Sequence, residues 1–371
     1  MFRYATLRDI EIEALFARLC PAVLWRHHCS IPGSCDPGAS EALVRFSVCG
    51  IHGALPVGRH AVAGLIIVLF TASSALAWNS KGHMMVAYVA YQRLTPAARA
   101  RVDDLLLRNP SYTKWEMTIP ATISGAEKKL RIFMLAATWP DEIKAAHSGD
   151  AADGSDDGCR PNGASSAQNT GYSDHLRHRY WHFVAMPFTS DGSPLPPIPT
   201  PNAQDRIHLF RTVLASITES DDLKSYDLTW LLHLVGDVHQ PLHVATRVSG
   251  TEPDGDHNGS RVAICPAPCK DDLRAFWNTV LGTQATVTAA ENLAKTLKAA
   301  PTGDGAVLDE AIWVRDSFEL AQSTVYKPPV GAGRGPFTIT AAYRASAKSV
   351  ARRQIALAGA RLANVLNADL K

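Results

Sequence analysis

The sequence predicts an all-α fold, a single mostly helical domain with long loops. Apolar residues recur at helical spacing in most segments after residue 80. Strand signals are few, and no G-x-G-x-x-G or P-loop pattern occurs. The composition, 46% hydrophobic and 19% charged residues, is that of an ordinary globular protein. A net charge of +2 gives no global electrostatic argument for nucleic-acid binding, so such a partner must be argued from a site.

Residues 58–77 have the pattern of a secretory signal peptide. A basic flank precedes an apolar stretch over 61–70, and small residues follow up to Ala77. This stretch is short for a transmembrane helix, which needs about 20 residues; an uncleaved anchor is the alternative. We interpret residues 1–57 as a non-native or unstructured leader. The chain 78–371 is then expected to be exported to the periplasm or out of the cell, without stable membrane association.

Helical periodicity divides the chain after Ala77 into helices and loops. A first helical segment covers 81–107 and restarts at Thr95-Pro96, where Thr caps the second helix and Pro occupies its first turn. Further helices are expected over 130–137, 205–218, 223–238, 284–299, 306–323 and 339–370, and long loops over 146–174, 189–201 and 250–270.

Two cysteines are close enough in sequence to form a local disulfide. Cys265 and Cys269 flank Pro-Ala-Pro, and a bridge between them requires an oxidising compartment. Cys159 would then remain unpaired in the exported chain. No matched pair of C-x-x-C motifs occurs, which argues against a structural zinc ribbon.

The segment 230–243, Trp-Leu-Leu-His-Leu-Val-Gly-Asp-Val-His-Gln-Pro-Leu-His, carries most of the candidate metal ligands. His233 and Asp237 are four residues apart and therefore share one face of a helix. Pro241 bends the chain before His243, so three ligands of the type that zinc prefers can point into one concavity. Core histidines bonded to backbone are the alternative. His239 points elsewhere and is interpreted as structural.

Three further segments offer weaker candidates. Asp141 follows Trp-Pro at the end of a helical run, and His182 lies among aromatics in an apparent short extended segment, 179–184. After signal cleavage, the free amino group and the carbonyl oxygen of Trp78 can chelate a metal ion, and His83 can close on the same ion.

Taken together, these motifs resemble the S1/P1 nuclease family, zinc phosphodiesterases whose helical fold is shared with bacterial zinc phospholipase C. The resemblance covers 78–371 and rests on four motifs in order. They are W-x4-H at Trp78, W-P-D at Trp139, W-H-F at Trp181 and H-x-x-G-D-x-x-Q-P-L-H at His233.

The resemblance implies a role for each matching residue. Asp141, His182, His233 and Asp237 would hold one zinc ion. Trp78 and His83, with a bridging Asp237, would hold a second, and His243 would be one ligand of a third. Phe183 matches an aromatic that stacks on a base, whereas the family's base-reading Asp is Ala185 here.

The chain departs from the family where the third zinc ion is completed. The family's N-L-H-x-x-W-D segment is Asp-Leu-Arg-Ala-Phe-Trp-Asn here, so that Arg274 and Asn278 replace the His and the Asp. A guanidinium cannot ligate zinc. Three interpretations stay open: Arg274 binds phosphate in place of the third ion, Asp256 or His257 substitutes as a ligand, or the protein is weak or inactive.

The expected function is that of an exported, monomeric, zinc-dependent endonuclease. It would hydrolyse phosphodiester bonds of single-stranded DNA and RNA to 5′-phosphate products, with Asp141 and Arg274 as catalytic residues. Two zinc ions are expected, and the third position is altered. A zinc phospholipase C-like phosphodiesterase and a non-catalytic protein that binds zinc or nucleic acid are the alternatives.

Overall fold

A computed structural model of the chain describes residues 78–144, 153 and 168–370. The chain divides into two units, Met1–Ser34 and Cys35–Lys371, and every described residue belongs to the second. The predicted leader, the predicted signal peptide, Cys159 and most of the predicted loop 146–174 lie outside the described residues. Among the helices that are described, none has both the length and the apolar character needed to cross a membrane.

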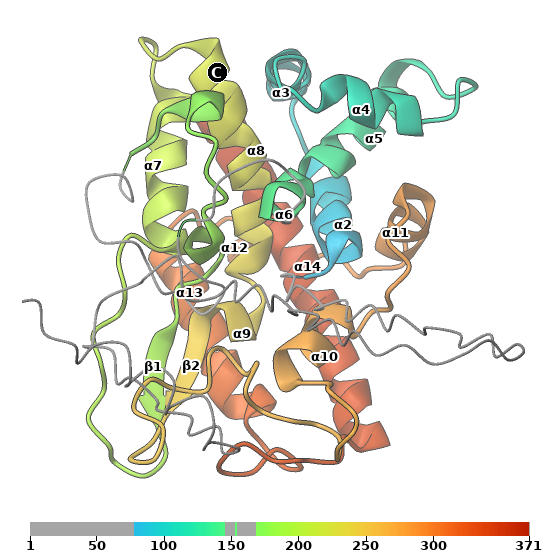
Figure 1. Cartoon of the computed structure of the whole chain (residues 1–371). Coiled ribbons are helices and arrows are strands. Elements are labelled where there is room, and N and C mark those ends of the chain that lie inside the picture. Colours follow the sequence, from blue (N-terminus) through green and yellow to red (C-terminus); the bar gives the residue numbers. More distant parts are fainter. Residues whose placement is uncertain (1–77, 145–152, 154–167, 371) are drawn as a thin grey trace, which may run out of the picture. The chain divides into compact units, whose positions relative to one another are not determined.

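The fold is mostly helical, as predicted, and a small sheet accompanies the helices (Figure 1). The α-helices are α2 (Ser80–Tyr91), α3 (Pro96–Leu106), α4 (Tyr112–Thr118), α5 (Gly125–Ala136), α6 (Trp139–Lys144), α7 (Ala203–Ala215), α8 (Asp221–Asp237), α9 (Pro241–Val244), α10 (Leu273–Thr279), α11 (Val287–Ala294), α12 (Thr302–Gly305), α13 (Glu310–Leu320) and α14 (Ala341–Asp369). Short 3₁₀ turns, η3 (Gly171–Ser173) and η4 (Arg179–His182), and a π-helical turn, η5 (Ala321–Val325), complete the helical elements.

The sheet has two parallel strands, β1 (Met186–Thr189) and β2 (Ala245–Val248). Met186 lies opposite Ala245, and the register continues to Thr189 opposite Val248. The strands begin shortly after η4 and directly after α9, so the pairing holds these two elements side by side at the end of α8 (Figure 1).

Capping side chains set the helix boundaries that periodicity leaves open. Thr95 accepts a hydrogen bond from the Ala98 N–H and begins α3, which confirms the predicted restart. The helix predicted over 205–218 begins earlier, because Asn202 and Asp205 form a capping box, and ends at Ala215. The helix predicted over 284–299 is shorter. The Thr286 side chain accepts a hydrogen bond from the Ala289 N–H and so caps the helix at its start, and the helix ends at Ala294. Sequence reasoning missed α4, α6, α9, α10, α12 and the sheet.

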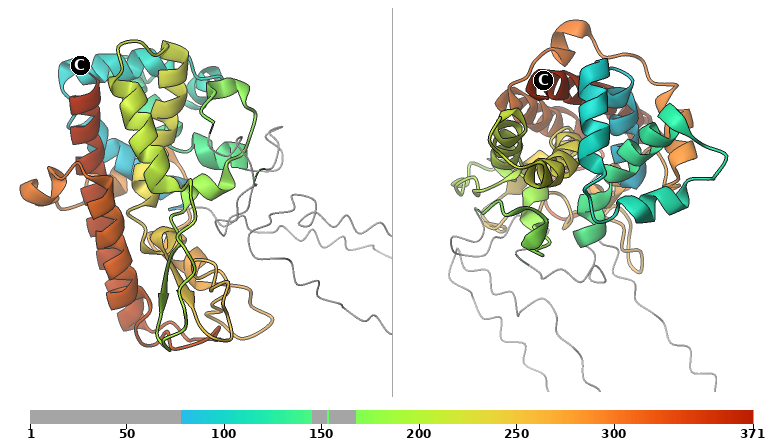
Figure 2. Two further views of the ribbon diagram at one scale, coloured as in Figure 1. Left: turned by 90° about the vertical axis from the view of Figure 1, so that its left-hand side faces the viewer. Right: turned by 90° about the horizontal axis from the view of Figure 1, so that it is seen from above.

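Helix α8 is the core of the described structure. Almost all its residues are buried, since apolar side chains surround the helix on every side. It packs against α2, α3, α6, α7 and α14, and Figure 2 shows α14 running beside these helices. Polar residues at the end of such a helix are therefore removed from water.

The loop 250–270 is present as predicted and carries the predicted disulfide. Cys265 and Cys269 are bonded, with their Cα atoms 5.7 Å apart. Ala263 pairs with Asp272, whose side chain caps α10 by accepting the Ala275 N–H. The closed loop thus leads directly into the helix that carries Arg274 and Asn278.

The prediction of an extended segment over 179–184 is wrong for its first four residues. Residues Arg179–His182 form the 3₁₀ turn η4, and only Phe183 returns to extended backbone. The turn begins at His178, whose backbone is left-handed (φ 45°) and whose ring stacks on Trp181 at 3.5 Å. Its two ring nitrogens lie 2.8 Å from Asp153 Oδ2 and 2.9 Å from Asp174 Oδ2. Contacts of His178 with nearby Trp181 and Asp174 and with Asp153, 25 residues earlier, thus set the turn that positions His182.

The stability that His178 contributes is expected to decrease at alkaline pH. Burial disfavours the imidazolium, but hydrogen bonds and attraction from Asp153 and Asp174 outweigh it and raise the pKa of His178 above 6.5. The folded state therefore binds more protons than the unfolded state between 6.5 and the raised pKa, and stability falls as pH rises through that window. The substitution His178→Gln should lower the free energy of unfolding more at about pH 5.5 than at about pH 9. Urea titrations of both proteins measure the difference; equal losses at both pH values would contradict it.

Candidate metal centre

The structure brings six of the seven predicted metal ligands, all those that would bind through a side chain, to the C-terminal end of α8. Each is buried, and together they come from five elements. They are His83 on α2, Asp141 on α6, His182 at the end of η4, His233 and Asp237 on α8, and His243 on α9. The predicted shared face of α8 is observed: His233 Nε2 lies 3.3 Å from Asp237 Oδ2.

Asp237 lies at the centre of this group. Its Oδ2 is 3.0 Å from His182 Nδ1, and its Oδ1 is 3.5 Å from both His83 Nε2 and His243 Nδ1. With His233, one carboxylate thus faces four imidazoles. Such a carboxylate is suited to bridging two cations.

The spacing of the donor atoms fits zinc. Bond lengths of about 2.0–2.2 Å to tetrahedral zinc place ligand atoms about 3.3–3.6 Å apart. His182 Nδ1 and His233 Nε2 are 3.0 Å apart, and His233 Nε2 is 3.8 Å from Asp141 Oδ1. Two overlapping groups have ligand atoms within 4.8 Å of one another: His83, Asp141 and His233, and His182, His233 and Asp237.

Several buried ligand atoms have no hydrogen-bond partner among the described residues. They are both ring nitrogens of His83, Asp141 Oδ2, His182 Nε2, Asp237 Oδ1 and His243 Nε2. A buried polar atom without a partner costs about 1–3 kcal/mol, and a charged one costs more. A cation bound among these atoms would satisfy both the imidazole lone pairs and the carboxylate charge, so the residues present fit a zinc cluster.

Backbone carbonyls orient two of the imidazoles. His233 Nδ1–H donates to Ala137 O at 2.8 Å, and His243 Nδ1–H donates to His182 O at 3.0 Å. Each bond leaves the Nε2 lone pair available for a metal ion. Metal-ligating histidines are commonly fixed in this way.

Burial keeps most of these histidines neutral. It lowers the pKa of His83, His182 and His243 well below 6.5, and repulsion from neighbouring cationic groups acts in the same direction. Burial also raises the pKa of Asp237 to about 6, against the attraction of His233. His233 differs from these three: burial lowers its pKa, but attraction from Asp237 and Asp141 outweighs burial and raises the pKa above 6.5. At neutral pH three imidazoles are thus neutral and Asp237 is ionised, the forms that bind metal, and metal binding would displace a proton from His233.

Gly236, the glycine of the H-x-x-G-D motif, allows α2 to approach α8. A Cβ atom on Gly236 would lie 2.9 Å from His83 Nδ1 and 3.2 Å from its Cε1. Any larger residue would therefore displace this ligand. The motif contains glycine because of a contact with a helix about 150 residues earlier in the chain.

Trp78, the seventh predicted ligand, leads into α2 beside the cluster. Its side chain is buried and packs against Gly82, where a Cβ would lie 2.6 Å from the Cβ of Trp78. The next residue is anchored to α10, because the Asn79 N–H donates to Asn278 O at 3.1 Å. Ligation through the Trp78 amino group stays a prediction.

The altered third position is occupied by packed polar side chains. The Phe183 ring stacks on His243 at 4.5 Å, and the Arg274 guanidinium lies 5.3 Å from the centre of the same ring. The Asn278 side-chain oxygen accepts a hydrogen bond from the Gln240 amide. Phe183 is fully buried, so its predicted stacking on a base stays a prediction.

The second interpretation of this position, a substitute ligand, receives no support. Asp256 is buried and accepts hydrogen bonds from the Arg247 N–H at 3.1 Å, the Gly259 N–H at 3.2 Å and the Tyr326 hydroxyl at 2.8 Å. Neither Asp256 nor His257 belongs to a potential metal-binding group in the part of the chain that is described.

Sequence reasoning missed one charged residue of the site. The Lys144 side chain is buried, with its Nζ 3.3 Å from Asp141 Oδ1 and 5.9 Å from the centre of the Phe183 ring. Its signal was local: Lys144 is three residues after Asp141 and shares its helical face. An isolated lysine after W-P-D resembles a solvated helix end, and only the packing of α6 shows that it is enclosed.

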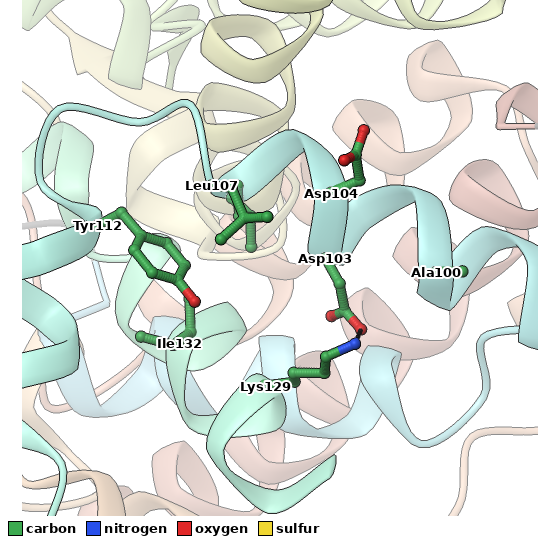
Figure 3. A pocket seen from close by; sticks show the side chains of 8 residues that line it. Ala100, Asp103, Asp104, Leu107, Tyr112, Lys129 and Ile132 are labelled. Carbon is green, nitrogen blue, oxygen red and sulfur yellow. Dashed lines mark ion pairs between the residues drawn. The ribbon is translucent and has the colours of Figure 1, made fainter. Parts of the chain in front are cut away.

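A separate pocket of about 250 Å³ lies between α3, α4 and α5, away from the predicted ligands (Figure 3). Its lining includes Asp103 and Lys129, which form an ion pair at 3.2 Å, together with Leu107 and Tyr112. None of the candidate metal ligands lines it, so we assign it no role in the chemistry.

Comparison with protein families gives one match. A family model described as S1/P1 Nuclease matches residues 78–371, which is more than half of the chain. None of the curated proteins compared with the chain matches it.

Proposed function

The chain belongs to the S1/P1 nuclease family, and from this premise we propose that it is an exported zinc-dependent endonuclease that cleaves single-stranded DNA and RNA to 5′-phosphate products. The family implies a hydrolase that acts on phosphodiester bonds. The observation that carries the proposal is the buried carboxylate of Asp237 surrounded by four imidazoles. No arrangement of this kind is needed for folding alone.

We infer two zinc positions that share Asp237. Asp141, His182 and His233 would complete one, and His83 with the amino and carbonyl groups of Trp78 would complete the other. Bound zinc would supply an activated water and positive charge for the phosphoryl oxygens.

The remaining residues would bind and orient the substrate. Asp141 would accept or position a proton, and it forms an ion pair with Lys144. Lys144 and Arg274 would bind phosphate oxygens, since both lie over the Phe183 ring beside the cluster. Phe183 would stack on a base.

Metal analysis together with substrate assays tests the proposal. We expect about two zinc ions per exported chain, cleavage of single-stranded DNA and RNA, and no release of phosphorylcholine from a lecithin emulsion. Less than one zinc ion per chain and no cleavage would exclude the proposal. Hydrolysis of lecithin alone would favour a phospholipase C-like enzyme instead.

Restoring the family's residues at the third position is expected to increase activity. The double substitution Arg274→His and Asn278→Asp should place an imidazole and a carboxylate near His243, whose Nε2 has no described partner. A further ion stabilising the leaving oxygen should raise kcat about tenfold or more, and zinc content should rise by about one ion. Arg353→His, at an exposed position of α14, is a matched surface control. A loss of activity without added zinc would contradict this prediction: the variant would then form no third site and would lose only the phosphate contact of Arg274.

A further inference from the structure

The turn between Asp237 and His243 connects two of the candidate ligands. Within it, the His239 N–H donates to Gly236 O at 3.2 Å, and the Gln240 N–H donates to Asp237 O at 2.9 Å. The turn is therefore hydrogen-bonded directly to the backbone of Asp237, so a shift of His239 would move this ligand.

His239 is buried, and both of its ring nitrogens are occupied. Its Nδ1–H donates to Val235 O at 2.7 Å, and its Nε2 accepts a hydrogen bond from Arg361 Nη1 at 3.0 Å. Since a guanidinium can only donate, the imidazole is the neutral form with its proton on Nδ1. His239 is therefore not a metal ligand, and its ring anchors the turn to α14.

Arg361 is held rigidly enough to act as that anchor. It is 2% exposed, its Nε donates to Asp304 O at 3.0 Å, and its Nη2 donates to Asp316 Oδ2 at 3.0 Å. The planar guanidinium fixes the relative directions of these three bonds. About two helical turns earlier on α14, Gln354 Nε2 donates a hydrogen bond to His239 O at 3.3 Å. Helix α14 therefore contacts His239 at both its side chain and its backbone.

We propose that Arg361 is a positioning residue for the metal centre: through His239 it fixes the turn that sets Asp237 and His243 at their 3.5 Å separation. This inference rests on the zinc site of the proposed function. Arg361 contacts none of the six buried side-chain ligands, and it acts on the cluster from a different helix. Loss of the Arg361–His239 bond is expected to widen the range of positions open to Asp237.

Zinc affinity, measured by competition with a chromophoric chelator well below the unfolding temperature, tests the proposal. Arg361→Met should weaken zinc binding about 10–100-fold, the effect of removing a partner that orients a metal ligand. Arg361→Lys should weaken it as well, because a single ammonium group cannot maintain all three bonds, and this variant serves if the Met variant does not fold. The unfolding temperature of the zinc-free protein is recorded in parallel.

A matched control and a double-mutant cycle separate positioning from general stability. Arg211 also makes three polar contacts, to Leu308 O, Glu310 and Asp369, but none to the turn. Arg211→Met should lower the unfolding temperature and leave zinc affinity unchanged. If Arg361 acts through His239, Arg361→Met should add no further loss of zinc affinity in a His239→Ala background.

The results distinguish a failure of the positioning role from a failure of the proposed zinc-dependent function. Unchanged zinc affinity in both Arg361 variants, or additive losses in the cycle, overturns the positioning role while leaving the zinc enzyme in place. An unaltered protein that binds no zinc overturns both.

Discussion

Asp237→Asn is expected to lower kcat/KM about 1000-fold or more and to reduce zinc content by at least about one ion per chain. The carboxylate faces four imidazoles at 3.0–3.5 Å, so an amide in its place removes the bridging charge. A metal ion contributes several kcal/mol of transition-state stabilisation, and each 1.36 kcal/mol is a tenfold change in rate. Because burial raises the pKa of Asp237 to about 6, the neutral amide should not destabilise the zinc-free fold.

Asp227→Asn is the matched control for this substitution. Asp227 lies on the same helix, is fully buried, and accepts a hydrogen bond from Asn169 Nδ2 at 2.9 Å. Burial raises its pKa well above the usual range, so an amide resembles its folded, protonated form. We expect this variant to keep its zinc and its activity. Equal zinc content in the Asp237 variant and the unaltered protein would contradict the assignment.

Retention of Ala77 ahead of Trp78 is expected to remove the second zinc ion and to lower kcat about 100-fold. An added residue converts the Trp78 amino group into an amide, which lacks the basic lone pair of an amine. Trp78 is buried, and the Asn79 N–H is bonded to Asn278 O, so the segment has little freedom to bring another ligand into place. Chains beginning at Ala77 and at Trp78, verified by mass spectrometry, should be compared for zinc content and for cleavage of single-stranded DNA.

Trp78→Phe in a chain that begins at residue 78 provides the control. This variant keeps the amino group and the carbonyl oxygen and changes only the ring that packs near Gly82. It should retain both zinc ions, with a modest loss of stability. If the chain that retains Ala77 binds as much zinc as the chain that begins at Trp78, the amino terminus is not a ligand.

The sequence alone determined the helical class, the order of the motifs and the candidate metal ligands. Periodicity identified α8, which was predicted over 223–238 and is observed over Asp221–Asp237. The spacing of His233 and Asp237 placed both on one face, because four residues make about one helical turn. The disulfide between Cys265 and Cys269 also followed from spacing within a short loop. These features depend on neighbours in the chain.

Only the tertiary structure decided which groups enclose the cluster. Lys144 became part of the site because α6 packs on α8, and Gly236 proved necessary because His83 of α2 lies against it. The roles of Arg361 and Asn278 depend on partners that lie 122 and 38 residues away in the chain. Local sequence patterns predict which face of a helix a residue occupies and which residue caps the helix. They do not predict which distant helix packs against that face and buries it. The charge, burial and hydrogen bonding of a metal site arise from that long-range packing.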